Sequence, residues 1–278
     1  MKKIISILAA AVLTFTSLSV MAFTDMPEGS GYQRAIEKLS ALNMINGYED
    51  GTFRPDQFVT RAEFAKMTVL ALGKQEMATG AAGRFWDVAD NHWASGYMNY
   101  VAENGYIKGY PDGSFRPNEN IPFEQVITIL VRMLGYTADE VGYHWPRDYI
   151  DKGSVLGITE GVYYNQKDWM TRKDVALLLD RTLETDINGQ TGTKLIDTTG
   201  FKLVENVTVI ATKEQDASLL SDIVKTSSGN YKYTLPTINE FVGTTGSIYL
   251  NKAGKIQYIE PKEQTKRTVV VNSVVDNT

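Results

Sequence analysis

The chain has 278 residues, of which 28 are basic and 33 acidic, and it contains no cysteine and two histidines. The lack of cysteine excludes a disulfide scaffold, a thiol nucleophile, a thiolate zinc or iron–sulfur site and a lipid-modified cysteine. Two histidines leave few ligands for transition metals, and the net charge of −5 argues against bulk attraction to nucleic acid or anionic lipid. The composition therefore predicts no cofactor, no metal and no nucleic-acid partner.

Residues 1–22 are typical of an export signal. Lys2 and Lys3 precede a long apolar run that closes on Val20–Ala22, with small residues where a signal peptidase cleaves. The alternative is an uncleaved anchor, because roughly 20 apolar residues can just span a bilayer. Cleavage after Ala22 removes two of the 28 basic residues against 33 acidic ones, which gives the mature chain a net charge of −7 and no membrane segment.

An internal repeat follows. Residues 23–26 (FTDM) recur at 85–88 (FWDV), and residues 45–55 (INGYEDGTFRP) recur at 107–117 (IKGYPDGSFRP), both with a shift of 62. A third, worn copy follows with a shift of 52, which maps His92-Trp93 onto His144-Trp145. It is three residues shorter in its loop and has TRKD at 171–174 where copy one has TRAE at 60–63. A repeat of this size indicates stacked supersecondary units.

Each copy has the pattern of a helix, a turn-rich loop and a second helix. Ala35, Leu39 and Leu42 predict a first helix that ends near residues 46–47. Thr60 and Glu63 form a capping-box pattern that predicts the start of the second helix. The apolar face of that helix recurs at Val126, Ile129, Leu130 and Met133, and again at Val175, Leu178, Leu179 and Thr182.

The repeated apolar faces predict three helix pairs that pack around a shared centre in a pseudo-threefold all-α domain. We call its three copies copy one (residues 23–80), copy two (81–136) and copy three (137–185).

These motifs resemble S-layer homology (SLH) domains. The family pattern stands here at Phe85–Val88, His92–Ala94, Gly109–Asn118 and Thr60–Glu63, and copy three is degenerate because it lacks the Asp-Gly-x-Phe-Arg-Pro turn. The resemblance implies a three-pronged helical spindle that binds secondary cell-wall polysaccharide, often pyruvylated and therefore anionic, in grooves between the repeats. It also implies that the protein attaches to the bacterial cell wall without a covalent bond.

An acidic chain that binds an acidic glycan needs preformed local cation sites. Arg61 and Arg172 each lie in the first turn of a predicted helix, where free backbone N–H groups and the dipole favour an anion. A guanidinium also matches a carboxylate bidentately. The resemblance implies that this arginine binds polysaccharide; the alternative is a solvated helix-start residue. Copy two has Phe123 instead, which predicts a weakened groove there and unequal use of the grooves.

Two further pairs of candidate polysaccharide-binding residues come from recurring motifs. Asp25 and Asp87 could accept hydrogen bonds from sugar hydroxyls, or could cap the first turn of their repeats. Gly47 and Gly109 could adopt positive φ and allow close approach of a sugar, or could stop the first helix.

Trp93 could stack on a sugar ring, although a buried packing role is the favoured alternative. Arg54 and Arg116 follow the turn and could reach the groove or brace the loop. A calcium loop at residues 46–57 is disfavoured because Tyr48 and Gln57 stand at ligand positions.

The composition changes after residue 185. Residues 186–194 (DINGQTGTK) predict a short linker, and residues 195–278 predict a small, mostly β domain, either an open sheet or a barrel. The strand candidates are 204–211, 231–235, 247–251, 255–260 and 268–275, with a hairpin turn at 251–254. The last of these needs a partner within the sheet, in another subunit or in further chain.

The sequence therefore predicts an α+β multidomain, secreted, non-enzymatic protein of the cell wall or S-layer, whose partner is secondary cell-wall polysaccharide. One alternative is a structural S-layer subunit or spacer that self-associates through its β domain. Another is a fragment of a cell-wall hydrolase, because spacing alone does not exclude a catalytic carboxylate pair.

Overall fold

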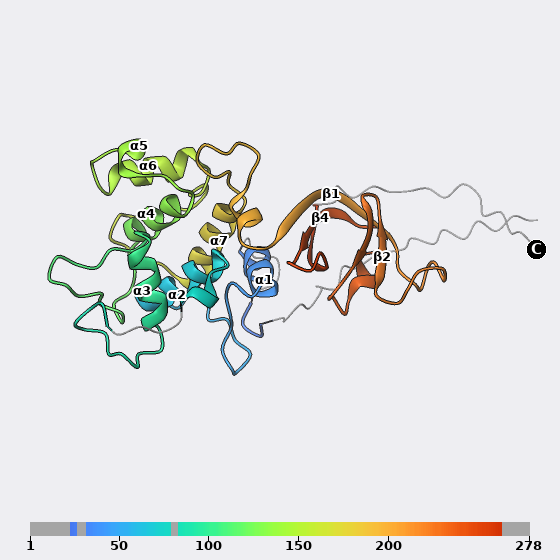
Figure 1. The fold of residues 1–278 in the computed structure, drawn as a ribbon, viewed down its shortest axis with the longest axis horizontal. Helices are drawn as coiled ribbons and strands as arrows, with labels where there is room; N and C mark the ends of the chain where they lie inside the picture. The colour runs from blue at the N-terminus through green and yellow to red at the C-terminus, as the bar shows by residue number, and fades with distance from the viewer. Residues whose placement is uncertain (1–22, 27–31, 79–82, 263–278) are drawn as a thin grey trace, which may run out of the picture.

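The computed structural model describes residues 23–26, 32–78 and 83–262. The export segment 1–22 and the strand candidate 268–275 lie outside these residues. Within them, seven α-helices precede a five-stranded antiparallel sheet, so the mixed α+β class is confirmed. The helical part and the β part follow one another along the long axis of the molecule (Figure 1).

Both predicted helices are present in each copy, and their predicted apolar faces are buried. Copy one contains α1 (Gln33–Ala41) and α2 (Arg61–Ala71), and copy two contains α3 (Ser95–Glu103) and α4 (Phe123–Met133). Copy three contains α6 (Arg147–Val155) and α7 (Arg172–Leu183), with the short α5 (Ala138–Val141) before them. The capping box at the start of α2 is confirmed, since Thr60 and Glu63 each bond the other's backbone N–H.

The first helix ends earlier than predicted. α1 stops at Ala41, and Asn43 then takes the left-handed conformation, with φ of 59°. Gly105 and Gly157 stand at the same position in copies two and three and have φ of 74° and 77°. This position ends the helix because left-handed backbone cannot continue it, and glycine or asparagine tolerates that conformation best.

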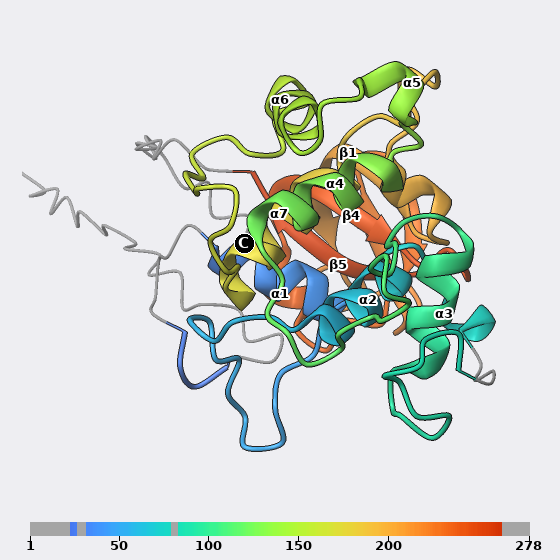
Figure 2. The same ribbon diagram turned by 90° about the vertical axis from the view of Figure 1, so that its left-hand side faces the viewer.

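The second helix of each copy packs on the first helix of another. α2 contacts α3, α4 contacts α6, and α7 contacts α1. Three backbone hydrogen bonds join the segments just before the second helices: Val59 N to Met170 O (3.0 Å), Met170 N to Ile121 O (3.0 Å) and Ile121 N to Val59 O (2.8 Å). These bonds close a ring whose three side chains are fully buried. Figure 2 shows the helices in front of the sheet.

The predicted linker is an ordered hairpin. Asp186 and Lys194 pair in an antiparallel bridge, and Ile187 N donates to Thr193 O at 2.9 Å. Asn188 N donates to a backbone carbonyl at the end of α4, also at 2.9 Å, so the hairpin packs on copy two.

The β part contains β1 (Lys202–Ala211), β2 (Ile223–Thr226), β3 (Gly229–Lys232), β4 (Thr245–Leu250) and β5 (Ile256–Pro261), in the order β3-β2-β1-β4-β5. Three predicted strands are confirmed, β3 overlaps a fourth, and β2 was not predicted. The hairpin turn at 251–254 joins β4 to β5. A parallel bridge between Tyr233 and Ile256 brings the chain after β3 against β5, at the opposite edge of the sheet.

The two parts meet at a buried charge cluster around Lys38 of α1, which we call the Lys38 cluster. Lys38 Nζ lies 2.8 Å from Asp180 of α7, 2.5 Å from Glu184 directly after α7, and 3.0 Å from Glu260 of β5. It also donates to the hydroxyl of Tyr249 on β4 at 3.2 Å. Ion pairs from one side chain of α1 to the end of α7 and to β5 fix the β part to copies one and three.

Candidate functional site

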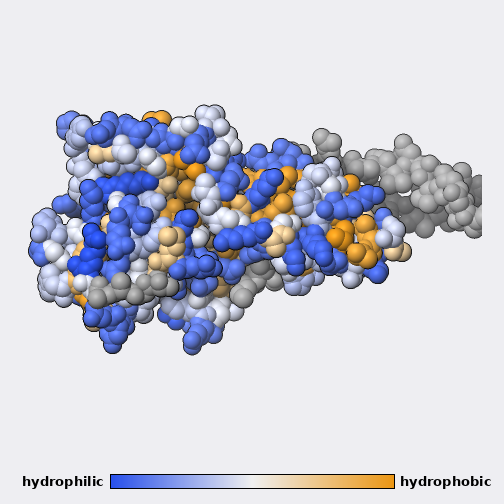
Figure 3. Space-filling view, in the orientation of Figure 1, coloured by the Kyte–Doolittle hydropathy of each residue, from blue (hydrophilic) through white to orange (hydrophobic). Residues whose placement is uncertain are grey.

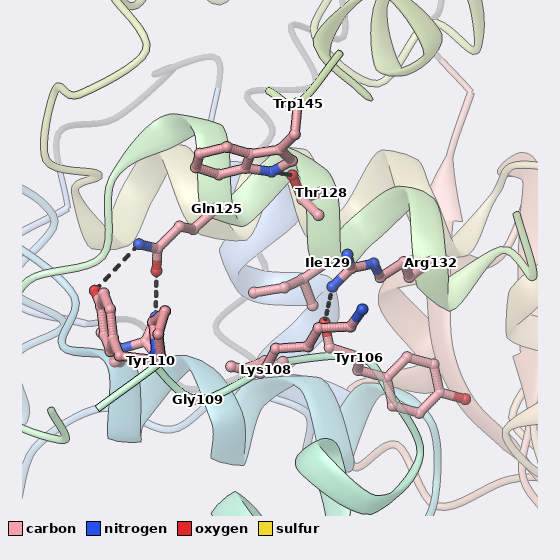
Figure 4. Close-up of a pocket in the computed structure, with 12 residues that line it drawn as sticks. Tyr106, Lys108, Gly109, Tyr110, Gln125, Thr128, Ile129, Arg132 and Trp145 are labelled. Carbon is pink, nitrogen blue, oxygen red and sulfur yellow. Dashed lines mark hydrogen bonds between the residues drawn. The ribbon is translucent and has the colours of Figure 1, made fainter. Parts of the chain in front are cut away.

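A pocket of about 280 Å³ lies between copies one and two; we call it the Arg61 groove. Arg61 comes from the start of α2, residues 106–111 come from the loop of copy two, and Trp145 comes from the segment before α6. Figure 4 shows the side chains of α4 between Trp145 on one side and the 106–110 segment on the other. The α4 residues that line it are Gln125, Thr128, Ile129 and Arg132.

Arg61 is only 3% exposed. Its Nε donates to Phe115 O at 2.8 Å, and its Nη1 donates to Oε1 of Gln125. Its guanidinium lies 4.8 Å from the ring centres of Tyr110 and Phe115. Nη2 is buried and has no hydrogen-bond partner among the described residues. A buried donor left unpaired costs about 1–3 kcal/mol, so this atom favours a ligand that supplies an acceptor.

Arg172 occupies the matching position between copies three and one, in what we call the Arg172 groove. It is 4% exposed; its Nε donates to Phe53 O and its Nη2 to Asn46 O, both at 2.8 Å. Its guanidinium lies 5.0 Å from the ring of Tyr48. Burial lowers the pKa of both arginines, because the charged form loses hydration. The alternative of solvated helix-start residues is therefore wrong for Arg61 and Arg172.

Phe123 stands at the third equivalent position and is buried too. Its ring stacks on Tyr164, with 5.8 Å between the ring centres, and the Tyr164 hydroxyl donates to Asp174 at 2.5 Å. Burial, followed by this bond to a carboxylate, raises the pKa of Tyr164 to about 12. We call this third site the Phe123 groove. An aromatic pair fills the place there that a buried guanidinium takes in the other two grooves.

Asp25 and Asp87 hold the loops by their backbone. Asp25 accepts hydrogen bonds from the N–H groups of Phe53 and Arg54 at 2.7 and 2.6 Å. Asp87 accepts the equivalent bonds from the N–H groups of Phe115 and Arg116. These partners are in the turn rather than in a first helical turn, so the helix-capping alternative is wrong. Arg54 adopts φ of 57°, and the paired bonds help to hold this left-handed residue.

Gly47 and Gly109 do not adopt positive φ, so that expectation is wrong. They also lie beyond the end of the first helix and do not stop it. The reason for glycine is lack of space: a Cβ at Gly47 would lie 2.2 Å from the ring of Phe23, and one at Gly109 would lie 2.4 Å from the ring of Phe85. These glycines let the aromatic residue of the FxD motif pack under the groove loop.

Arg54 and Arg116 brace the loops and also flank the grooves. Arg116 pairs with Asp112 at 3.2 Å, and its guanidinium lies 3.8 Å from the ring of Tyr110. The bonds from Ser114, followed by that from Arg116, lower the pKa of Asp112 to about 2. Arg54 repeats these contacts in copy one, with Asp50 at 2.9 Å and the Tyr48 ring at 3.8 Å. Tyr48 and Tyr110, which we call the groove tyrosines, therefore each contact an arginine from each of two copies.

Trp93 is 57% exposed, so the favoured alternative of a buried packing tryptophan is wrong. Its ring stacks on His92 at 5.6 Å, and Lys66 Nζ lies 5.9 Å from its centre. Trp145, its equivalent in copy three, is 51% exposed and donates from Nε1 to Thr128 at 3.0 Å, which fixes the ring beside the Arg61 groove. Trp145 aligns with Trp93 in the repeat, but neither Trp145 nor Gln125 was among the predicted site residues.

Comparison with known proteins supports two SLH domains. Residues 22–65 and 84–127 match the model of the S-layer homology domain, and copy three lies outside both segments. The chain is 31% identical to a cell surface protein of Thermoanaerobacter kivui over 93% of its own length, and 34% identical to a surface layer protein of Brevibacillus choshinensis over 58%. It is 38% identical to a cellulosome-anchoring protein of Acetivibrio thermocellus over 42%.

The chain spans 36%, 15% and 26% of the lengths of these three relatives. Taken together, the matches indicate a secreted protein of the bacterial cell wall. None of the helices in the described part of the chain has the length and apolar character needed to cross a bilayer.

Proposed function

We propose that this chain attaches an exported protein to the bacterial cell wall by binding secondary cell-wall polysaccharide that carries sugar carboxylates, such as pyruvate ketals. The observation that carries the proposal is the Arg61 groove, which combines a buried guanidinium, an Nη2 atom without a partner among the described residues, and an exposed tryptophan. A guanidinium recognises a carboxylate, and a fixed indole ring offers an apolar face to a sugar. The cellulosome-anchoring relative supports an anchoring role.

The proposal includes copy three as a third, degenerate SLH repeat, and the three copies as a pseudo-threefold unit. Equivalent bonds support it. Arg61 N donates to Glu119 O, and Phe123 N and Arg172 N donate to the equivalent carbonyls of the following loops, each at 2.9 Å. The ring of bonds through Val59, Ile121 and Met170 relates the copies in the same way.

The residues have different proposed roles. Arg61 and Arg172 bind sugar carboxylates, while Trp93 and its equivalent Trp145 stack on sugar rings. The remaining candidates support the grooves: Asp25 and Asp87 through the backbone, Gly47 and Gly109 by leaving space, and Arg54 and Arg116 by holding the groove tyrosines.

Co-sedimentation with purified cell-wall sacculi tests the proposal. The chain should pellet with intact sacculi and stay in solution once the secondary polysaccharide has been stripped from them. A variant with both Arg61→Ala and Arg172→Ala should stay in solution with either preparation. Equal pelleting of the native chain with both preparations would contradict anchoring through this polysaccharide. Release of soluble sugar or peptide from the walls would contradict a role without catalysis.

A second candidate function is self-association of the β part in a surface layer. Ile210 and Leu220 are large apolar side chains exposed on the β part, 46% and 67% respectively. Figure 3 shows hydrophobic surface gathered over this end of the molecule, whereas the helical part is mainly hydrophilic on the same face. Lattice formation on purified walls, lost in a variant with Ile210→Lys and Leu220→Lys, would support this candidate.

A further inference from the structure

The grooves between the copies have different charge. The charged residues that line the Arg61 groove are Arg61, Lys108 and Arg132, and the described lining contains no carboxylate. This groove is therefore strongly cationic in a chain whose net charge is negative. Potential of one sign concentrates ions of the other sign, so the groove attracts anions.

The repeat alignment gives the charges at the matching positions of the other grooves. In the Arg172 groove, Arg172 and Lys66 are balanced by Glu49 and Glu63, because asparagine replaces Lys108 and leucine replaces Arg132. Burial has the larger effect and lowers the pKa of both guanidinium groups, while nearby carboxylates raise it: Glu63 and Asp25 for Arg172, and Glu119 and Asp87 for Arg61. In the Phe123 groove, Arg181 alone opposes Glu160 and Asp174. One groove is thus cationic, one balanced and one acidic.

Gln125 is one source of the charge difference between the Arg61 groove and the Arg172 groove. The equivalent residue in copy one, Glu63, accepts hydrogen bonds from the Thr60 N–H and hydroxyl at 2.8 and 2.9 Å. In copy two, Pro122 replaces that threonine and has neither an N–H nor a hydroxyl to offer. Gln125 therefore has no capping role, and its side chain instead reaches Arg61 and the Tyr110 hydroxyl, the latter at 3.3 Å. Figure 4 shows both bonds of Gln125.

The two guanidinium groups also differ in which of their nitrogen atoms are paired. In Arg61, Phe115 and Gln125 take Nε and Nη1, and Nη2 is left without a partner among the described residues. In Arg172, the carbonyl of Asn46 takes Nη2. A neutral amide orients the Arg61 guanidinium without cancelling its charge, whereas a carboxylate at the same place would compete with a ligand carboxylate.

We propose that the Arg61 groove is the one high-affinity site for a sugar carboxylate in this chain, and that Gln125 is the positioning residue that sets this preference. The inference rests on the proposed function and specifies which groove takes the anionic sugar. The replacement of the TRAE motif in copy two therefore has two consequences. Phe123 removes the cation from one groove, and Gln125 completes the site in its neighbour.

A defined sugar tests the inference. The probe is the 4,6-pyruvate ketal of a methyl hexopyranoside, and the reference is its uncharged methyl ester. By titration calorimetry, the native chain should bind one equivalent of the acid at least tenfold more tightly than the ester. Gln125→Glu should remove most of this preference at pH 7 and reduce the salt dependence of acid binding. The preference for the acid should return as the pH falls and the new carboxyl is protonated. A residue with a merely structural role would not produce this pH profile.

Two variants complete the test. Gln75→Glu, the same change at an exposed residue outside the grooves, should leave the tight site unchanged. Lys108→Glu introduces a carboxylate at an exposed residue of the groove lining and should also weaken acid binding. This variant keeps the inference testable if Gln125→Glu proves unstable. Two equal sites in the native chain, or an unchanged acid preference in both Gln125→Glu and Lys108→Glu while Arg61→Ala abolishes binding, would overturn the inference and leave the proposed function standing. Failure of the native chain to pellet with sacculi would overturn the proposed function itself.

Discussion

Lys38 and Arg61 are two cations of the helical part, 2% and 3% exposed respectively, with opposite surroundings. Lys38 has three carboxylates within 3.0 Å of its Nζ, from two structural elements. Arg61 has carbonyl and amide oxygens as partners and keeps one nitrogen unpaired among the described residues. A buried cation with surplus carboxylates ties parts of the fold together, whereas one without carboxylates remains available to an anionic ligand.

The largest expected effect is on stability and comes from Lys38→Met. The change leaves Asp180, Glu184 and Glu260 close together without their cation, which should lower the free energy of unfolding by about 3–5 kcal/mol. Urea unfolding monitored by tryptophan fluorescence measures it. Adding Asp180→Asn and Glu260→Gln to Lys38→Met should restore much of the loss. A loss below about 1 kcal/mol would show that the cluster does not hold the two parts together.

Arg61→Met should give the reverse result, a loss of binding with little loss of stability. Methionine keeps an unbranched apolar side chain but removes the hydrogen bonds of a charged donor. Affinity for the pyruvate-ketal sugar should fall by about 2–3 kcal/mol, while the free energy of unfolding should change by about 1 kcal/mol. Calorimetric titration and urea unfolding of the same sample separate the two. A larger loss in the free energy of unfolding than in the free energy of sugar binding would contradict this contrast between Arg61 and Lys38.

The pH dependence of the Lys38 cluster gives an effect of intermediate size. Burial raises the pKa of Asp180 to about 6, although Lys38 opposes the shift. The folded protein therefore holds this proton more tightly than the unfolded chain, so Asp180 stabilises the fold below about pH 4, and the contribution is lost as the pH rises through 6. Asp180→Asn should reduce the fall in stability between pH 4 and pH 7 by about 2 kcal/mol. Unfolding midpoints at the two pH values provide the measurement.

The opposite sign is expected one turn further along α7. The ion pair with Lys38 lowers the pKa of Glu184 in spite of its burial, so its contribution is lost as the pH falls. Glu184→Gln should therefore cost stability at pH 7 and not at low pH. An identical pH response in both variants would contradict the individual assignments.

The smallest expected effect is that of Phe123→Arg. An arginine at this position restores the family motif, but Asp174 and Glu160 leave the Phe123 groove without the positive charge of the Arg61 groove. The variant also loses the stacking of Phe123 on Tyr164. Affinity for the sugar carboxylate should change less than threefold, or about 0.6 kcal/mol. A larger gain would show that the missing cation alone limits this groove.

Local patterns predicted the helical part well. The repeat, the capping box of Thr60 and Glu63 and the apolar faces all depend on residues within a few positions of one another. The surroundings of Arg61 were not predictable in this way, because Phe115 is 54 residues away and Gln125 is 64 away. Likewise, the packing of Phe23 explains Gly47 better than any turn does.

The sequence does contain a signal for a buried charge at Lys38. Lys38 falls within the apolar stripe of Ala35, Leu39 and Leu42, and a lysine on a buried face requires a charged partner. Its partners could not be named, because they lie 142 to 222 residues further along the chain. The strand β2 was missed because its four residues include Lys225 and Thr226, which form no clear apolar pattern.

The closed ring of Val59, Ile121 and Met170 makes the three copies depend on one another. Each copy supplies one donor and one acceptor to the ring, so the loss of any copy leaves an N–H and a carbonyl of the other two without partners in the centre of the core. Deletion of any one copy from this chain should therefore destabilise the two that remain, so the three copies depend on one another for folding.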